Sequence, residues 1–493
     1  MLSKRSLFIQ NNWVKGKGEA FYSRNPRTDN LNWKGRAASI EQINFAIKSA
    51  GNVQEQWWEK GREFRQDVLM RYTDQLTRNK EWLAEIIGQE TGKNPWECRA
   101  EVAGMIHKMT VSVEAYHERC VEKERELNLT KNYTKFKPLG VIAILAPFNF
   151  PGHLPQGQLI PALLAGNTVV LKPSEYCPMV GLAMASLWEQ SQPPAGVLNV
   201  IQGNADVGRA LVVHDDINAI FFTGSEEHGR EIAQFFSGKY EKLLALELGG
   251  NNPLILTKVK DQQSAIECII QSAFSTTGQR CTCARRLIVV KNNENKKLVD
   301  DLIKASKALV IGDQYKKSLM GPLISKNARK MALEQQQAYI AKGAKSLLEM
   351  KALGKKGAFI SPGIIDISAL TEDDDEECFS PLLKVSWVED LQEAIFEANK
   401  SRFGLSAALL SDDKNEFSSF YSQIKAGIIN WNTPTIGSSA YAPFAGVGAS
   451  GNHRSAAYLM IDSCVTAIAS TQQEHCRPIQ NSQQWFRSCI NKK

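Results

Sequence analysis

The chain has 493 residues, of which 43% are hydrophobic and 23% are charged, and its formal net charge is +7. This length exceeds what one hydrophobic core usually holds, so we expect two or three domains. The 59 basic and 52 acidic side chains are spread along the sequence. Such a diffuse excess suits small anionic ligands and does not indicate nucleic-acid binding. No run approaches 18 apolar residues, so no membrane span is predicted.

The start of the chain and its cysteines indicate a cytoplasmic setting. The segment MLSKRSLFIQNNW lacks the apolar core and small-residue cleavage site of a secretory signal. The ten cysteines have no framework spacing, and a chain of this size does not need disulfides to fold. We therefore expect free thiols.

The first half of the chain predicts helices followed by a parallel sheet. Apolar residues recur at helical spacing from 40 to 90, and residues 120–138 alternate charged with apolar side chains, as in an exposed ribbon. Five short apolar runs then predict buried strands, at 138–150, 167–172, 196–201, 218–222 and 243–248. Helical segments separate them, at about 155–165, 178–191, 205–213 and 227–237. This alternation is typical of a doubly wound sheet, whose polar turns PFNFPG, KPSE and TGSEEHG would share one rim.

A second α/β block follows Gly249 and Gly250, where we expect a domain boundary. Its predicted strands are NPLILT, RLIVVK, LLKVSW and AGIINWN. The tail from about 471 to 493 is polar and lacks periodicity, so it is expected to be loosely held.

Two glycine-containing segments are candidates for nucleotide binding. GVGASG at 446–451 matches the dinucleotide pattern, but it lacks the following strand and the acidic residue that the motif requires, so we interpret it as a tightly packed loop. FFTGSEEHGRE at 221–231 is the better candidate, because a strand there runs into a helix whose free amides could meet a pyrophosphate. Lys172 and Glu175 in LKPSE end another strand and could bind ribose hydroxyls.

The segment FSTTGQRCT raises the question of whether Cys281 is reactive. A free thiol has a pKa near 8.5, so a catalytic cysteine needs a base, a cation or a helix dipole, and Arg280 and a neighbouring helix end could supply such a field. Core packing is the usual fate of a lone cysteine. Cys283 is near, but no further cysteine or histidine completes a metal site, so no metal is predicted.

Seven motifs, in order, resemble those of the NAD(P)-dependent aldehyde dehydrogenase superfamily. They are APFNFPG, LKPSE, FTGSEEHG, ALELGGNNP, FSTTGQRC, EECFSP and YAPFAGVGASG, and the match runs from about residue 10 to 470. The resemblance implies a Rossmann-type NAD-binding domain at 1–248 and an α/β catalytic domain at 249–435. It also implies that 436–493 returns to the first domain and adds a strand at 464–471 to a β oligomerisation arm with the 120–138 ribbon. A homodimer or higher homo-oligomer would follow.

The resemblance also implies roles for individual residues. Cys281 would be the nucleophile and Glu247 the general base, while Asn149 and the Cys281 backbone N–H would form the oxyanion hole. The implied cofactor is NAD, bound by Lys172, Glu175, Gly224, Ser225, Glu226, Glu227, His228, Gly229 and Glu377.

Within the superfamily, the FPGHLP and ASGNHR stretches look most like the branch that oxidises N-succinylglutamate 5-semialdehyde in arginine catabolism. Its substrate would be held by Gly437, Ser438, Ser439 and Arg454, although a structural ion pair is at least as strong an interpretation of Arg454. Ala445 and Ser380 depart from the usual glycines, and Gln156 and Gln158 stand where the branch commonly has Asn and His. Three alternatives stay open: another semialdehyde such as glutamate 5-semialdehyde, a CoA-acylating enzyme, which Glu247 disfavours, and an inactive nucleotide-binding protein.

Overall fold

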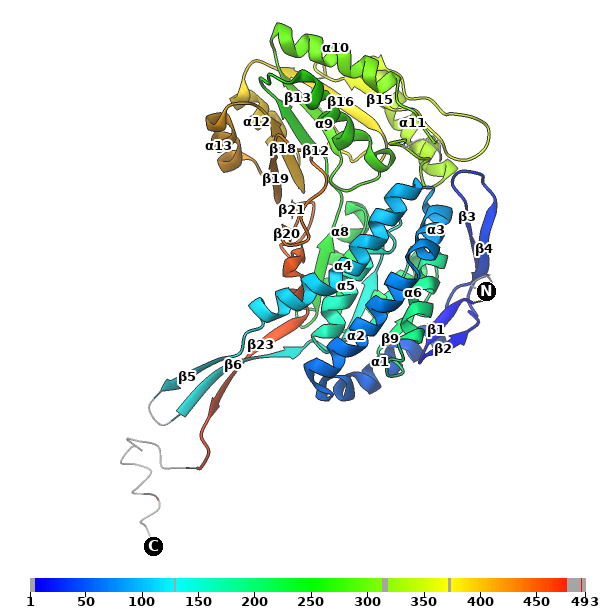
Figure 1. Cartoon of the computed structure of the whole chain (residues 1–493), viewed down its shortest axis with the longest axis vertical. Coiled ribbons are helices and arrows are strands. Elements are labelled where there is room, and N and C mark those ends of the chain that lie inside the picture. Colours follow the sequence, from blue (N-terminus) through cyan, green and yellow to red (C-terminus); the bar gives the residue numbers. More distant parts are fainter. Residues whose placement is uncertain (1–4, 128–129, 313–317, 371–373, 477–488, 490–493) are drawn as a thin grey trace.

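The computed structural model describes residues 5–127, 130–312, 318–370, 374–476 and 489 (Figure 1). Two seven-stranded sheets dominate it, each with helices packed against it. Most of the expected polar tail, residues 477–488 and 490–493, lies outside the described residues.

The first sheet is a doubly wound parallel sheet with the strand order β11-β10-β7-β8-β9-β1-β2. The five strands β7 (Val141–Leu145), β8 (Thr168–Lys172), β9 (Leu198–Val200), β10 (Ala219–Thr223) and β11 (Leu243–Glu247) run parallel, and all five were predicted. β1 (Leu7–Ile9) and β2 (Asn12–Val14) extend one edge in antiparallel pairing. Every residue of β7 and β8 is buried, which explains why their sequences are continuous apolar runs rather than alternating ones.

Helices cover both faces of this sheet. The four predicted connecting helices are α5 (His153–Leu164), α6 (Pro178–Gln190), α7 (Ala205–Val213) and α8 (Glu226–Phe236). The amphipathic segment before the sheet forms α1 (Ile40–Glu59), α2 (Gly61–Arg78) and α3 (Lys80–Thr91), as expected. A fourth helix, α4 (Pro95–Arg119), was not predicted. Asn94 and Glu97 form a capping box around Pro95 at its first position, so its start is encoded locally.

The second sheet has the order β14-β15-β16-β13-β12-β18-β19. Its strands are β14 (Lys345–Leu348), β15 (Gly363–Asp366), β16 (Leu382–Val388), β13 (Ala284–Val290), β12 (Asn252–Leu256), β18 (Ser406–Leu410) and β19 (Ile428–Trp431), and β14 alone of these runs antiparallel to its neighbour. The four predicted strands are β12, β13, β16 and β19. The flanking helices are α9 (Gln262–Phe274), α10 (Asn293–Lys307), α11 (Lys326–Ala341), α12 (Leu391–Asn399) and α13 (Lys414–Gln423).

A three-stranded sheet projects from the body (Figure 1). It pairs β6 (Thr130–Pro138) with β5 (Lys123–Leu127) on one side and with β23 (Val465–Gln472) on the other. The predicted ribbon and the predicted late strand therefore lie side by side. Short elements complete the chain: the hairpin β3 (Ala20–Arg24) and β4 (Leu31–Arg36), the pairs β17 (Phe403–Gly404) with β21 (Val447–Gly448) and β20 (Pro443–Phe444) with β22 (Ala456–Ala457), and the 3₁₀ turns η2 (Ser275–Gly278) and η3 (Tyr458–Ser463).

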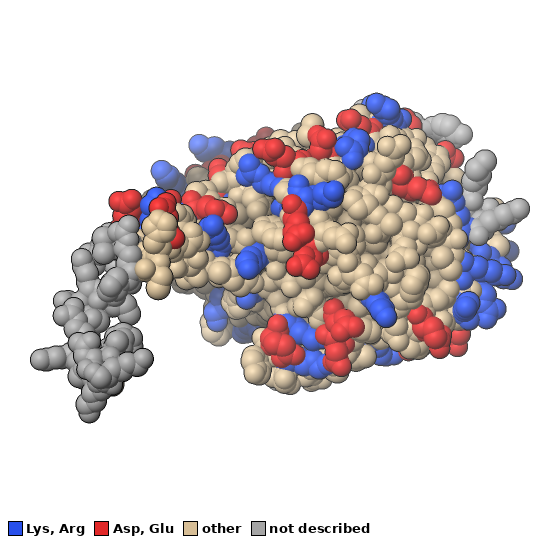
Figure 2. All heavy atoms as spheres, turned by 90° about the horizontal axis from the view of Figure 1, so that it is seen from below, with Lys and Arg blue, Asp and Glu red and all other residues tan. Residues whose placement is uncertain are grey.

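The surface charge is mixed, in agreement with the sequence. Figure 2 shows basic and acidic side chains interspersed over the face in view, with wide neutral areas between them. Among the helices of the described ranges, none is both long enough and apolar enough to cross a membrane.

The connections of the two sheets fix the place of the site. The chain runs from β7 outward to β8 and β9, and then returns to the other side of β7 to form β10 and β11. Ligands of doubly wound sheets bind at the carboxyl ends of the strands where the order reverses, here between β7 and β10. β11 ends at Glu247 and β12 begins at Asn252, so the carboxyl edge of the first sheet meets the amino edge of the second.

Candidate active site

The loop that carries Cys281 has an unusual backbone. Thr276, Thr277 and Gly278 adopt consecutive positive φ angles of 53°, 58° and 70°. β-branched residues rarely adopt this left-handed conformation, so other contacts must hold it. The Thr276 hydroxyl donates to Glu97 Oε1 at 2.8 Å, and the Thr277 hydroxyl donates to the Gly321 carbonyl at 2.9 Å. The strained conformation is thus held by contacts with distant parts of the chain, one to a side chain and one to a backbone carbonyl.

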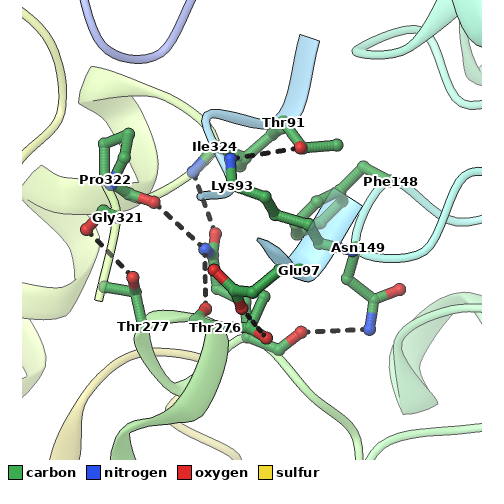
Figure 3. Close-up of a pocket in the computed structure, with 11 residues that line it drawn as sticks. Thr91, Lys93, Glu97, Phe148, Asn149, Thr276, Thr277, Gly321, Pro322 and Ile324 are labelled. Carbon is green, nitrogen blue, oxygen red and sulfur yellow. Dashed lines mark hydrogen bonds between the residues drawn. The ribbon is translucent and has the colours of Figure 1, made fainter. Parts of the chain in front are cut away.

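A small cavity lies beside this loop (Figure 3). Its wall combines the α3–α4 junction, the turn after β7, η2 and the segment around Pro322. Gln279 bridges these parts: its Nε2 donates to the Thr276 and Pro322 carbonyls at 3.2 and 3.3 Å, and its Oε1 accepts from the Ile324 N–H at 2.9 Å. Gln279 therefore anchors the backbone two residues before Cys281.

Two further residues hold the loop on its other side, and sequence reasoning missed both. Asn252 Nδ2 donates to the carbonyls of Cys281 and Cys283 at 2.7 and 2.9 Å. The buried Arg285 donates to the Gly278 carbonyl at 2.6 Å and lies 3.5 Å from Glu377 Oε1. Two sequence signals could have revealed these residues. One is an arginine within an otherwise apolar strand, and the other is the second Asn of GGNNP.

Cys281 is half-buried, whereas Cys283 is fully buried. Burial, together with the nearby carboxylates of Glu247 and Glu377, raises the pKa of the Cys281 thiol to about 12, against the opposing effect of Arg285. The cation that favours the thiolate is therefore Arg285. The expected contribution of Arg280 is not found, because its guanidinium instead donates to the Thr276 hydroxyl at 2.8 Å.

Glu247 lies at the end of β11 and is buried. Burial raises the pKa of this carboxyl well above its ordinary value, against a smaller lowering by the Ala456 backbone N–H. Within the described part of the chain, neither carboxylate oxygen makes a hydrogen bond of regular geometry. A buried carboxyl with a raised pKa beside a thiol is typical of a group that exchanges protons during a reaction.

The Asn149 amide is oriented by the same loop. Its Nδ2 donates to the Gln279 carbonyl at 3.0 Å, and its Oδ1 accepts from the Phe150 N–H at 3.0 Å. No described residue accepts the second N–H of the amide. The structure therefore brings together Asn149, Glu247 and the Cys281 loop, three segments that are far apart in the sequence.

Lys172 and Glu175 lie on the rim of the first sheet, as predicted. Lys172 ends β8, and its buried ammonium donates to the Pro173 carbonyl at 3.2 Å. Burial lowers its pKa, while Glu175 at 3.9 Å opposes this effect. The Glu175 side chain is 46% exposed, which leaves its carboxylate accessible to a ligand.

The turn from Gly224 to Gly229 opens α8 at the switch point. Ser225 caps the helix by accepting from the His228 N–H. A Cβ on Gly224 would lie 2.4 Å from the Phe222 ring, and one on Gly229 would lie 2.4 Å from Leu248, so a side chain at either position would displace a neighbouring side chain. Glu226 is bound by Arg402 at 3.1 Å, and Glu227 is exposed.

Glu377 lies beside the Gly249–Gly250 turn. A Cβ on Gly249 would lie 1.8 Å from Glu377 Oε2, and the Gly250 N–H donates to the carboxylate. Burial raises the Glu377 pKa, and Arg285 opposes the rise. Glu377 therefore lies on the same side of the Cys281 loop as Arg285.

The four predicted substrate residues are exposed. Gly437 adopts a φ of 85°, and Ser438 and Ser439 follow it in the same loop. Arg454 makes no ion pair with any residue that the structure describes. Asn452, two residues earlier, bonds to the Leu246 N–H at 2.9 Å and to the Leu244 carbonyl at 2.8 Å, which ties this segment to β11.

Three of the residues that depart from the family pattern, Gln156, Gln158 and Ser380, are buried. Gln156 is fully buried and accepts from the Tyr72 hydroxyl at 3.3 Å, so it bears on packing rather than on a substrate. Gln158 is buried and donates to Thr223 Oγ1 at 3.3 Å. Ser380 is buried, and a Cβ on Gly278 would lie 2.2 Å from its carbonyl oxygen.

The interpretation of GVGASG as a packed loop is confirmed. A Cβ on Gly446 would lie 2.1 Å from the Ser450 carbonyl oxygen, and Gly448 adopts a φ of 58°. Among the described residues, no group of three or more His, Cys, Asp or Glu side chains could hold a metal ion.

Known proteins share this architecture over nearly the whole chain. Residues 13–467 match the profile of the aldehyde dehydrogenase family. A methylmalonate-semialdehyde dehydrogenase from Sinorhizobium meliloti, solved with NAD, is 26% identical and superimposes with a TM-score of 0.91, covering 97% of this chain and 99% of that chain. Lactaldehyde dehydrogenase from Escherichia coli is 26% identical with a TM-score of 0.89, covering 95% and 99%. A glyceraldehyde-3-phosphate dehydrogenase from Methanocaldococcus jannaschii, solved with NADP, is 26% identical with a TM-score of 0.85, covering 92% and 99%.

Proposed function

The chain belongs to the aldehyde dehydrogenase family, and on that premise we propose that it oxidises an aldehyde to a carboxylate through a thioester on Cys281. The observation that carries this proposal is the meeting of Cys281, Glu247 and Asn149 around one strained loop. A non-catalytic scaffold would not need two β-branched residues in a left-handed conformation four and five residues before its cysteine.

The chain's own residues supply the covalent steps. The Cys281 thiolate attacks the aldehyde carbon, a C–S bond forms, and the carbonyl oxygen becomes an alkoxide. The free Asn149 N–H and the Cys281 backbone N–H stabilise this charge. A nicotinamide cofactor, when bound, accepts the hydride that leaves the same carbon, so that a thioester remains. Glu247 then takes a proton from water, the hydroxide attacks the thioester carbon, and the C–S bond breaks to release the carboxylate and the thiolate.

The rim residues fit a nicotinamide dinucleotide. The Lys172 ammonium has one protein acceptor within hydrogen-bonding distance among the described residues, which leaves donors for ribose hydroxyls. Gly224 and Gly229 leave no room for side chains and bring the α8 backbone close to the sheet. NAD is the preferred cofactor in this proposal, because the exposed Glu175 carboxylate would accept from a ribose 2'-hydroxyl but repel a 2'-phosphate.

The proposed substrate is N-succinylglutamate 5-semialdehyde, which places the reaction in arginine catabolism. The loop with Ser438 and Ser439 is exposed and offers hydroxyls and backbone N–H groups to a carboxylate, and Arg454 has no described counter-ion. The sequence likeness of FPGHLP and ASGNHR to that branch supports the same substrate.

A substrate panel tests this proposal. N-succinylglutamate 5-semialdehyde, glutamate 5-semialdehyde and short neutral aldehydes are assayed in parallel, each with NAD and with NADP. We expect the succinylated compound to exceed glutamate 5-semialdehyde by at least about 100-fold in kcat/KM, because donors built for a polar group stay unpaired without it. Equal rates would overturn the substrate while leaving the reaction class, and absence of turnover with every aldehyde would favour an inactive nucleotide-binding protein. Equal efficiency with NADP would overturn the role of Glu175.

The assembly and its location complete the proposal. In the part of the chain that the structure describes, the outer strands of the projecting β5, β6 and β23 sheet have no further pairing, and such edges favour pairing with a second copy, so we infer a homodimer or larger homo-oligomer. The free cysteines, eight of them buried or half-buried, suit a reducing cytoplasm.

A further inference from the structure

Lys108 is a buried cation that the mechanism above does not use. It lies on α4 and is 7% exposed. Its ammonium forms no hydrogen bond or ion pair with any described residue, and burial alone lowers its pKa to about 8, with no described carboxylate acting against the shift. An unpaired ammonium with little solvent contact is costly, so a counter-ion from outside the chain would stabilise its charged form.

The neighbouring lysine shows what a structural pair looks like here. Lys93, just before α4, lies 2.8 Å from Glu101 Oε2, and both side chains are almost fully buried. Glu101 Oε1 also accepts from the Gly152 and His153 backbone N–H groups. The acid nearest in sequence to Lys108 on the buried side of α4 is therefore already fully engaged. Lys108 has no equivalent partner.

Lys108 packs against α5, the helix that follows the turn with Asn149. Its side chain runs over Gly157 of α5, where a Cβ would lie 3.2 Å from Lys108 Cε and 3.5 Å from its Nζ. Leu154 and Gly157 form a partly exposed stripe on α5, a helix that begins four residues after Asn149. β22 packs against α5, and the Ala456 N–H of β22 interacts with Glu247. The wall that α4 and α5 form around Lys108 therefore adjoins, through α5 and β22, the segments that carry Asn149 and interact with Glu247.

The same wall continues to the predicted substrate loop. His107, the residue before Lys108, contacts the ring of Tyr441 with 5.4 Å between ring centroids. Tyr441 donates its backbone N–H to Ser439 Oγ at 3.2 Å. The helix that carries Lys108 is therefore in contact with the loop that carries Ser438 and Ser439.

We propose that Lys108 is a substrate-binding residue that pairs with a carboxylate four carbons from the aldehyde carbon, in the wall between α4 and α5. This inference rests on the proposed aldehyde oxidation and extends it, because it names the substrate class as five-carbon aldehydes with a terminal carboxylate. The N-succinyl group is not required for this contact and would be bound elsewhere, at the exposed loop. The glycine at 157 serves the contact by leaving room for the lysine side chain.

The test compares two aldehydes that differ at one end only. 5-Oxopentanoate carries the carboxylate, and pentanal replaces it with a methyl group. Lys108→Met keeps the length and apolar stem of the side chain and removes its charge. We expect kcat/KM for 5-oxopentanoate to fall by about 30-fold or more, mainly through KM, and kcat/KM for pentanal to change by less than about threefold. Arg99→Met is the control, because Arg99 is an exposed cation on the same helix, and both aldehydes should keep their wild-type values.

An equal loss for both aldehydes in Lys108→Met, or no loss for either, would overturn the proposal. The wild-type protein gives an independent measurement if the variant does not fold. The ratio of kcat/KM for 5-oxopentanoate to that for pentanal should fall as the pH rises through about 8, because Lys108 loses its charge there. Other titratable groups should not produce this change in the ratio. Titration of Cys281 or Glu247 affects both aldehydes alike and therefore cancels in the ratio. Glu101 is paired with Lys93, and His153 on α5 stays neutral because burial lowers its pKa to about 3.

A ratio that is flat from pH 7 to 10 would overturn the proposal as well. A wrong substrate assignment can be told apart from a wrong role for Lys108. If N-succinylglutamate 5-semialdehyde is a poor substrate but Lys108→Met still discriminates 5-oxopentanoate from pentanal, the proposed substrate is wrong and the role of Lys108 stands.

Discussion

Without cofactor, the Cys281 thiol should be a slow nucleophile. Its pKa is raised to about 12 by burial, Glu247 and Glu377. At pH 8 such a thiol is roughly 0.01% ionised, against roughly 24% for a free thiol with a pKa near 8.5. The higher intrinsic nucleophilicity of the more basic thiolate recovers about 25- to 55-fold of that difference. Cys281 should therefore be alkylated about 50- to 100-fold more slowly than an exposed cysteine.

Iodoacetamide labelling followed by peptide mass spectrometry measures this rate, and the exposed Cys476 is the internal reference. The rate constant at Cys281 should rise about tenfold per pH unit from 7 to 9 without a plateau, since the thiolate fraction does so below the pKa. Glu247→Gln should accelerate labelling of Cys281 at pH 9, because the substitution removes a carboxylate that raises its pKa, and should leave Cys476 unchanged. A Cys281 that reacts as fast as Cys476 at pH 8 would refute this view of the resting site.

Three substitutions test the other parts of the site. Cys281→Ala should abolish aldehyde oxidation while NAD binding, measured by calorimetry, stays near wild type, and Cys283→Ala should keep substantial activity; the reverse pattern would move the nucleophile. Asn149→Ala should lower kcat by roughly 100- to 1000-fold as for one oxyanion donor, and a loss below tenfold would make Asn149 structural. Gly278→Ala should lower the melting temperature and reduce activity more than tenfold, because the residue has a φ of 70° and the new Cβ would lie 2.2 Å from the Ser380 carbonyl oxygen; a variant with wild-type melting and rate would contradict the described loop geometry.

Much of the fold could be predicted because local patterns agreed with tertiary structure. The strands VIAIL and TVVLK are buried on both faces, so their continuous apolar runs correctly predicted buried strands. β14, with the sequence KSLL and two exposed residues, gave no such run and was missed. β18, SAALL, is short and rich in alanine and serine, so its burial comes from its place between β12 and β19 rather than from its composition. The order of the strands follows from the crossovers, which no local pattern encodes.

In the site, the reacting residues could be predicted from the sequence, but the residues that hold them in place could not. The reactive residue types of Cys281 and Glu247 stand within recognisable motifs. Asn252, Gln279 and Arg285 act through contacts with backbone carbonyls, and any polar side chain in a sequence is compatible with such a role. The field at Cys281 was assigned to Arg280 because it is adjacent in sequence. The fold turns that side chain toward Thr276 and brings Arg285 to the loop instead.

The most direct test of the account is a single turnover of Glu247→Gln with NAD and N-succinylglutamate 5-semialdehyde. Loss of the base should slow hydrolysis by roughly two to four orders of magnitude and leave the earlier steps intact. The account predicts a burst of reduced cofactor equal to the enzyme concentration, and a protein whose mass increase maps to an acyl group on Cys281. A folded variant that binds NAD but gives neither the burst nor the acylated peptide, or one that turns over at the wild-type rate, would contradict it.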